Sequence, residues 1–312
     1  MSSTAIKRKK PRHQLEGAAK FNRISPVSNV FVTLLFIVLA LIAFLPMVFV
    51  TIISFSSEAS VTTIGYSFWP TEWSLDTYKF LLQRGDDIGR SFLNSVGVTV
   101  VGTCLGLILT STMGYALSRR TFGMRRFYTI FIFIPMLFYG GLVPTYMINT
   151  QFYGLRDTYW ALILPLACSS WYTIILRTFF TTTVPDSIIE SGKIDGASQL
   201  RIFVQLVLPI SLPAIATIGL FLTFAYWNDW YQAMLYLTKR QFYPLQYLLV
   251  SIEKQIDFLA RSADMMSTET IVLPTETMRM AIVVIAVVPI ACAYPFFQKY
   301  FISGLTIGAV KG

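Results

Sequence analysis

Six long stretches without a charged side chain constrain this chain more than any other feature. Each contains 19 to 34 residues, and together they hold 156 of the 312 residues: 24–57, 91–118, 127–155, 158–176, 202–228 and 280–298. Each is longer than the roughly 18 apolar residues that mark a candidate membrane-spanning helix. We therefore predict an all-α, multi-pass membrane protein with six transmembrane helices.

Composition supports this class and excludes several others. Only 13% of the residues are charged and 54% are hydrophobic, whereas a soluble domain has about 25% charged residues. A soluble enzyme, a disordered protein and a disulfide scaffold are therefore excluded. The three cysteines lie inside uncharged stretches without metal-ligand or redox spacing, and we expect them to be small buried apolar residues: Cys104, Cys168 and Cys292.

The expected spans cover residues 28–54, 91–118, 127–149, 159–180, 203–227 and 277–301. Pro209 and Pro213 predict a kink or break in the fifth span. The glycines of the second predict close packing against another helix: Gly97, Gly102, Gly106 and Gly114. The loop 229–275 is too long to be a bare connection, so we expect it to have a folded role.

Cationic residues predict the orientation of the spans, because they gather on the cytoplasmic side of membrane proteins. The side that holds both termini has 16 Lys and Arg against four acids, and the opposite side has 9 against 12. We therefore expect both termini to be cytoplasmic. The basic start within residues 1–27 is interpreted as a tail touching anionic lipid, and nothing else in the sequence favours nucleic acid.

The most informative cytoplasmic segment is 184–201. Ser187 and Glu190 have the spacing of a capping box, and Gly196 follows where a left-handed helix stop favours glycine. Ser198 is then placed to cap a second helix that returns to the membrane. These signals predict a short helix outside the bilayer, capped at both ends. Two interpretations stay open: an ordinary surface helix, or an element that docks onto another protein.

The residues of this segment resemble a known family. Glu190, then Asp195-Gly196-Ala197, and Leu208-Pro209 downstream resemble the "EAA" loop of permeases in binding-protein-dependent ABC importers. Ser191 and Gly192 stand where that loop has alanines. Further stretches resemble the carbohydrate-uptake branch, and within it the LplC/YtcP-like sugar permeases: Gly141–Tyr146, Trp227-Asn228-Asp229, Leu273–Thr277 and Gly308–Gly312.

The resemblance implies a type I ABC importer permease fold over residues 28–312, in a bacterial cytoplasmic (inner) membrane. It implies that one helix contacts a separate ATPase through Glu190, Ser191, Gly192, Asp195, Gly196 and Ala197. The tail 302–312 would reach the ATPase through Gly308, Ala309, Val310, Lys311 and Gly312, unless it is simply a frayed terminus. The implied partners are a second, related permease, two copies of the ATPase and an extracytoplasmic sugar-binding protein that the loop before the sixth span, roughly 238–275, would approach.

The chain itself is not expected to be an enzyme. It contains no phosphate-binding G-x-x-x-x-G-K-[ST] loop, so we expect another polypeptide to bind and hydrolyse ATP. No cofactor is expected on this chain. Aromatic and polar side chains near the membrane are candidates for contacts with the sugar, although packing is the commoner role of such residues: Tyr139, Tyr146, Asn149, Trp171, Tyr172, Tyr226, Trp227, Asn228 and Asp229.

Two other functions fit the sequence less well. An ATP-independent secondary sugar transporter or channel would need ionisable groups inside the membrane for ion coupling, and the six stretches contain none. An intramembrane enzyme would need a histidine, cysteine-pair or paired-carboxylate arrangement in the spans, which is missing. A carbohydrate importer permease, with an oligosaccharide as the expected cargo, is the function that the sequence favours.

Overall fold

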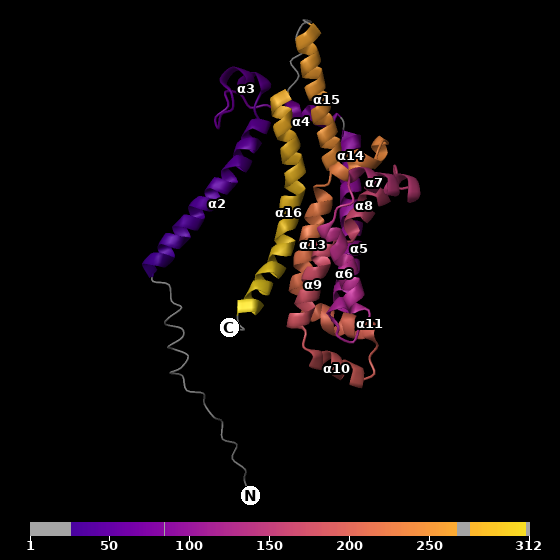
Figure 1. Ribbon diagram of the computed structural model, residues 1–312. Coiled ribbons are helices and arrows are strands. Elements are labelled where there is room, and N and C mark those ends of the chain that lie inside the picture. Colours follow the sequence, from indigo (N-terminus) through magenta and orange to yellow (C-terminus); the bar gives the residue numbers. More distant parts are fainter. Residues whose placement is uncertain (1–25, 84, 267–274, 310–312) are drawn as a thin grey trace.

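The computed structural model describes residues 26–83, 85–266 and 275–309, and its regular structure is helical apart from one isolated bridge between Ser56 and Trp73. The helices form an elongated bundle (Figure 1), with α10 (Asp186–Ile194) at one end and α15 (Leu245–Met266) projecting from the other. These two ends are called the α10 end and the α15 end below. The basic residues 1–25 and the stretch 267–274 lie outside the described residues.

Three long helices run most of the length of the bundle: α2 (Pro26–Ser54), α5 (Gly85–Ser118) and α16 (Thr275–Ala309). By length and composition, α2 and α5 are each able to cross a membrane. Residues 27–48 of α2 are exposed, whereas Ile53 and Ser54 at its end are buried. This helix leans away from the bundle (Figure 1), and it contacts α16. Such an apolar, exposed helix fits a lipid environment.

Three further spans are bent pairs of helices, so the described residues hold two spans, or five when each pair counts as one. The first bend is 115°, between α6 (Arg125–Leu137) and the unit α7–η1 (Leu142–Met147, Ile148–Phe152). The second is 45°, between α8 (Trp160–Ala167) and α9 (Ser170–Thr183). The third is 84°, between the unit α11–η2–α12 (Gln199–Ile202, Phe203–Val207, Leu208–Ile210) and α13 (Leu212–Trp227). The sixth expected span lies in α16, whose side chains are described only in part.

Local chemistry explains the breaks. The kink expected from Pro209 and Pro213 is confirmed, and it falls at Ser211 between them. The expectation of continuous helices over 127–149 and 159–180 was wrong. Gly141 has φ +93°, a conformation that few residues other than glycine adopt, and Cys168 is extended before Ser169 caps the next helix.

The core forms where α5 meets α8, α9 and α13. Three of the four glycines predicted to pack closely do so: a Cβ on Gly102 would lie 2.5 Å from Tyr226 Cζ, and those on Gly106 and Gly114 would also meet neighbouring helices. The prediction was wrong for Gly97, because a Cβ there meets nothing within 4 Å. Gly97 lies on an exposed side of α5, so sequence spacing alone did not separate it from the others.

Short helices complete the two ends. The α15 end holds α3 (Glu58–Ile64), α4 (Asp76–Leu82) and, within the loop predicted over 229–275, α14 (Tyr231–Tyr236), η3 (Arg240–Phe242) and α15. The folded role expected for that loop is thus a helical one.

The three cysteines are exposed rather than buried. Apolar residues of a membrane helix need no burial inside the protein, because lipid replaces the core as their apolar surroundings.

Candidate functional site

The segment 184–201 forms two capped helices joined by a tight turn at the α10 end (Figure 1). Gly196 has φ +75°, and it ends α10 with two backbone hydrogen bonds: Gly196 N–H to the Lys193 carbonyl at 3.0 Å, and Ala197 N–H to the Gly192 carbonyl at 2.9 Å. This is the Schellman arrangement that glycine favours. Ser198 Oγ then accepts the Arg201 N–H at 3.3 Å, so the predicted stop and second cap are both confirmed.

The predicted capping box at the start of α10 was wrong. The helix begins at Asp186, directly after Pro185 in an extended conformation, and no side-chain hydrogen bond caps it. Ser187 is therefore already inside the first turn, where its carbonyl accepts the Ser191 Oγ–H at 2.9 Å. Pro185, two residues before the expected cap, shifted the helix start, and it was the signal that the spacing argument overlooked.

Gly192 lies on the packed side of α10. It is buried, and a Cβ added to it would lie 3.1 Å from both Ile202 Cγ1 and Leu206 Cδ1. Ile189, also buried at 5% exposure, belongs to the main hydrophobic core. These contacts pack α10 against the α11–η2 segment, at the start of the fifth span.

Arg119 fixes the other end of α10, a role that the sequence analysis missed. Its guanidinium donates to the Phe180 carbonyl at 3.1 Å and pairs with Asp186 Oδ1 at 3.3 Å. It also lies 5.3 Å from the ring centroid of Tyr115. A cation at the end of α9 is favourable, because the last carbonyls of a helix carry partial negative charge. Arg119 therefore joins α5, α9 and α10.

The opposite side of α10 faces outward. Glu190, Ser191, Asp195 and Gly196 are exposed, and Ala197 is half-buried. Ile194 is 85% exposed, and Leu200 at the start of α11 is 69% exposed. A short helix that is buried on one side and exposes apolar and acidic groups on the other has the form of a docking element. At the far end of the chain, Gly308 and Ala309 belong to the last turn of α16, and Val310, Lys311 and Gly312 lie outside the described residues.

Two of the substrate candidates meet on one tyrosine of α14. The ring of Tyr146 stacks on that of Tyr236 with centroids 5.8 Å apart, and Asn149 Nδ2 donates to the Tyr236 hydroxyl at 2.8 Å. Tyr236 itself is buried at 2% exposure. The structure thus brings Tyr146 and Asn149 together, and it adds Tyr236, which no sequence motif had marked.

Three other candidates make packing contacts. Tyr226 is buried and donates its hydroxyl proton to the Ile163 carbonyl at 2.8 Å. Trp227 is buried as well, and its Nε1–H donates to the Ala286 carbonyl of α16 at 3.2 Å. Tyr172 stacks on Phe221 with centroids 6.2 Å apart. These residues join helices to one another, so any contact with a solute would be made by groups that already hold the bundle.

The remaining candidates lie apart. Tyr139, in the break after α6, is 77% exposed, and Trp171 on α9 is 57% exposed. Asn228 and Asp229 follow the last residue of α13, and Asp229 Oδ1 accepts the Gln232 N–H at 3.0 Å. Burial raises the pKa of Asp229 from 3.8 to about 6, although hydrogen bonds from the backbone of Gln232 and Tyr231 act in the opposite direction.

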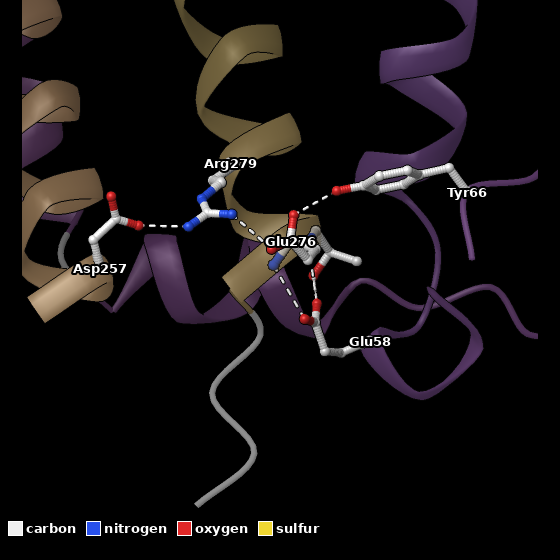
Figure 2. A network of polar contacts seen from close by, with 6 residues as sticks. Glu58, Tyr66, Asp257, Glu276 and Arg279 are labelled. Atoms are coloured by element: carbon white, nitrogen blue, oxygen red, sulfur yellow. Dashed lines mark hydrogen bonds and ion pairs between the residues drawn. The ribbon is translucent and has the colours of Figure 1, made fainter. Parts of the chain in front are cut away.

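A polar network at the α15 end was not anticipated from the sequence (Figure 2). It joins Glu58, Tyr66, Asp257, Glu276 and Arg279. The first two come from the segment between α2 and α5, called the first loop below, Asp257 comes from α15, and the last two come from the start of α16. Glu276 belongs to a stretch that carried the family resemblance, but its role depends on partners far away in the sequence. Among the described residues, no group of three or more His, Cys, Asp or Glu is placed to hold a metal ion.

These features define a helical membrane protein with broken spans and a short helix that is exposed at one end of the bundle. Comparison with known proteins gives the family. Residues 102–307 match the model of the binding-protein-dependent transport system inner membrane component. The chain belongs to this family of multi-pass inner membrane permeases, and it is a permease component rather than an enzyme.

Individual relatives agree with this assignment. The chain is 41% identical over 273 residues to the polygalacturonan/rhamnogalacturonan transport system permease protein YtcP of Bacillus subtilis (strain 168), covering 88% of this chain and 94% of that protein. It is 38% identical to protein LplC of the same organism, covering 87% of this chain and 90% of that protein. A solved bacterial ABC transporter involved in the import of the acidic polysaccharide alginate matches with a TM-score of 0.73 and 29% identity, covering 89% of this chain and 99% of that one. The resemblance and the fold class inferred from the sequence are confirmed.

Proposed function

We propose that this chain is the permease subunit of an ATP-driven importer for an oligosaccharide, and that it couples to a separate ATPase through the segment 184–201. The observation that carries the proposal is that α10 is packed on one side and exposed on the other. Gly192 and Ile189 anchor one side to the bundle, while Ile194 and Leu200 stay exposed on the other. A force applied to the exposed side would therefore reach the fifth span directly.

The carbohydrate cargo is supported by the relatives. YtcP is described as a permease for polygalacturonan and rhamnogalacturonan, a 27% identical relative in Bacillus subtilis (strain 168) as a melibiose, raffinose and stachyose import permease, and the matching solved structure as an alginate importer. From these relatives we infer that the transported solute is a sugar oligomer. The aromatic and polar candidates from Tyr139 to Asp229 are proposed as its contacts, with Tyr146 and Asn149 foremost because they converge on Tyr236.

The proposed assembly holds a second, related permease, two ATPase copies and an extracytoplasmic binding protein. We place the α10 end and both termini in the cytoplasm, and the α15 end outside, in line with the excess of Lys and Arg on the first side. The last residues of the chain, from Gly308 onward, would touch the ATPase. ATP would be bound and hydrolysed by that partner alone.

The test is co-purification and transport. The tagged chain is co-expressed with its genomic neighbours, and ATP hydrolysis and uptake of a galacturonan oligomer and an arabinan oligomer are measured in proteoliposomes. Ile194→Asp should abolish ATPase co-purification and uptake, because it places a charge in the middle of the docking surface. Leu82→Asp is the matched control: Leu82 is 75% exposed on α4 at the opposite end, so this variant should behave like the wild type.

Two results would overturn the proposal. If the wild-type chain purifies without an ATPase and moves solute in the absence of ATP, it is a secondary transporter. If Ile194→Asp transports normally, α10 is not the coupling element. For the pathway, unchanged uptake in both Trp227→Ala and Asp229→Asn would remove these two residues from it.

A further inference from the structure

The start of α16 is held by a carboxylate from a segment more than 200 residues away. Glu58 Oε1 accepts the Glu276 N–H at 3.1 Å, and Glu58 Oε2 accepts the Thr277 N–H at 3.0 Å and the Thr277 hydroxyl at 2.7 Å (Figure 2). The first N–H groups of a helix have no partner within it, so Glu58 caps α16 from α3. Thr277 Oγ1 also lies 2.9 Å from Thr77 Oγ1 of α4, in a buried contact.

Arg279 extends this cap to α15. Its guanidinium donates to Glu276 Oε1 at 2.6 Å and to Asp257 Oδ1 at 2.5 Å, and Glu276 in turn accepts the Tyr66 hydroxyl (Figure 2). The first turn of α16 is thus the place where the first loop and α15 are joined. The side chains of Asp257 and Arg279 are 38% and 35% exposed, so a docking protein has access to the contact.

A continuous series of contacts leads from this turn toward the α10 end. At a rise of about 1.5 Å per residue, α16 is a rod roughly 50 Å long. Trp227, at the end of α13, donates its Nε1–H to the Ala286 carbonyl of α16 at 3.2 Å. From there α13 leads to the bend at Ser211 and into the α11–η2 segment, against which Gly192 of α10 packs.

We propose that Arg279 is a positioning residue that transmits docking of the extracytoplasmic binding protein from α15 to α16, and through the Trp227–Ala286 contact to α10. The inference rests on the proposed function, since it assumes a binding protein on the α15 side and an ATPase on the α10 side. The Arg279–Asp257 contact connects α15 to α16, whereas the Glu58 cap holds α16 in place without it. Apolar side chains such as Ile256 of α15 and Met278 of α16 belong to one buried cluster, so the two helices stay packed without the ion pair. Because a partly exposed ion pair adds little to folding stability, its loss removes the polar contact between α15 and α16 without unfolding them.

The experiment measures ATP hydrolysis by the purified transporter in lipid nanodiscs, with and without saturating binding protein. The variants are Asp257→Asn, which keeps the Glu276–Arg279 pair, Arg279→Gln, and the two combined. The control is Asp76→Asn, which removes the exposed Lys79–Asp76 pair of α4 at the same end. The affinity for the binding protein is measured in parallel, so that a loss of docking is separated from a loss of transmission.

We expect basal hydrolysis and affinity to stay within about twofold of the wild type, while stimulation falls by about 3- to 30-fold in both single variants. The double variant should be no worse than Arg279→Gln, because both changes remove the same contact. Asp76→Asn should keep full stimulation.

Three results would overturn the inference. They are normal stimulation in Asp257→Asn, an equal fall of basal and stimulated hydrolysis, and additive losses in the double variant. If Arg279→Gln does not fold, Asp257→Asn decides alone. A wild-type complex without any ATPase would instead refute the proposed function itself, before any variant is compared.

Discussion

At the scale of single residues, two glycines give α10 its shape for different reasons. Gly192 provides room, since a Cβ would lie 3.1 Å from Ile202 and Leu206 atoms. Gly196 provides a backbone conformation at φ +75°, with open space around it. The first position tolerates a small change if the neighbouring side chains shift, whereas the second resists any side chain because the strain lies in the backbone itself.

Gly196→Ala should therefore destabilise the end of α10 by about 1–2 kcal/mol, the cost of a left-handed conformation for a residue with a Cβ. Gly123→Ala is the control, because Gly123 also lies in open space but has no positive φ. Hydrogen exchange at the Gly196 and Ala197 amides, which close the turn, should be faster in the first variant only. Unchanged exchange in Gly196→Ala would show that the turn is not held as described.

Asp229 makes a residue-scale prediction about pH. Its pKa of about 6 lies above the ordinary 3.8 because burial disfavours the charged form. The contribution of Asp229 to stability is therefore most favourable below pH 3.8, and it is lost as the pH rises through about 6. Asp229→Asn should raise the free energy of unfolding at pH 7 by about 1–3 kcal/mol, which is seen as a higher thermal midpoint. Near pH 4 it should leave stability unchanged. An equal gain at both pH values would contradict the assigned cause.

At the scale of helices, the contact between α5 and α13 depends on the absence of a side chain at Gly102. The Tyr226 ring that fills this space is fixed by its hydrogen bond to Ile163. Gly102→Ala should cost about 1–3 kcal/mol by overpacking. Gly97→Ala, one and a half turns earlier and in open space, should gain about 0.5–1 kcal/mol from helix propensity. Thermal midpoints in mild detergent should thus shift in opposite directions, and shifts of the same sign would refute this packing.

The helix scale also shows what a sequence can predict. The charge-free stretches marked the positions of the spans, because the membrane imposes length and polarity along the chain itself. The prolines marked the break at Ser211, but the breaks at Gly141 and Cys168 lie inside stretches that are charge-free throughout. The Gly141 carbonyl accepts the Thr145 N–H and hydroxyl, and Ser169 caps α9. The charge pattern that marked the spans carries no signal of these local contacts.

The candidate site divides in the same way. Gly196 and Ser198 could be assigned in advance because helix stops and caps are local. Arg119, Tyr236 and Glu58 could not, since each acts on groups 61 to 218 residues away. The EAA-like residues predicted where a partner would dock, whereas the contacts that connect this helix to the rest of the protein depend on the fold.

At the scale of the whole molecule, the protein has two ends of different construction. The α10 end presents exposed apolar groups on a firmly packed helix. The α15 end joins its loops through charged and hydrogen-bonded side chains at the first turn of α16. The 35-residue helix α16 and the bent fifth span connect the two. Such an arrangement suits a subunit that receives energy at one end and a solute at the other.

Site-specific cross-linking tests whether the ATPase contacts the α10 end and not the α15 end. In a background in which Cys104, Cys168 and Cys292 are replaced by serine, Ile194→Cys and Leu82→Cys are each introduced into the complex made with the genomic neighbours. The account predicts that a short bifunctional maleimide links Ile194→Cys to the ATPase, whereas Leu82→Cys is labelled only by a membrane-impermeant maleimide from outside the cell. Cross-linking of the ATPase to Leu82→Cys, or external labelling of Ile194→Cys, would contradict it.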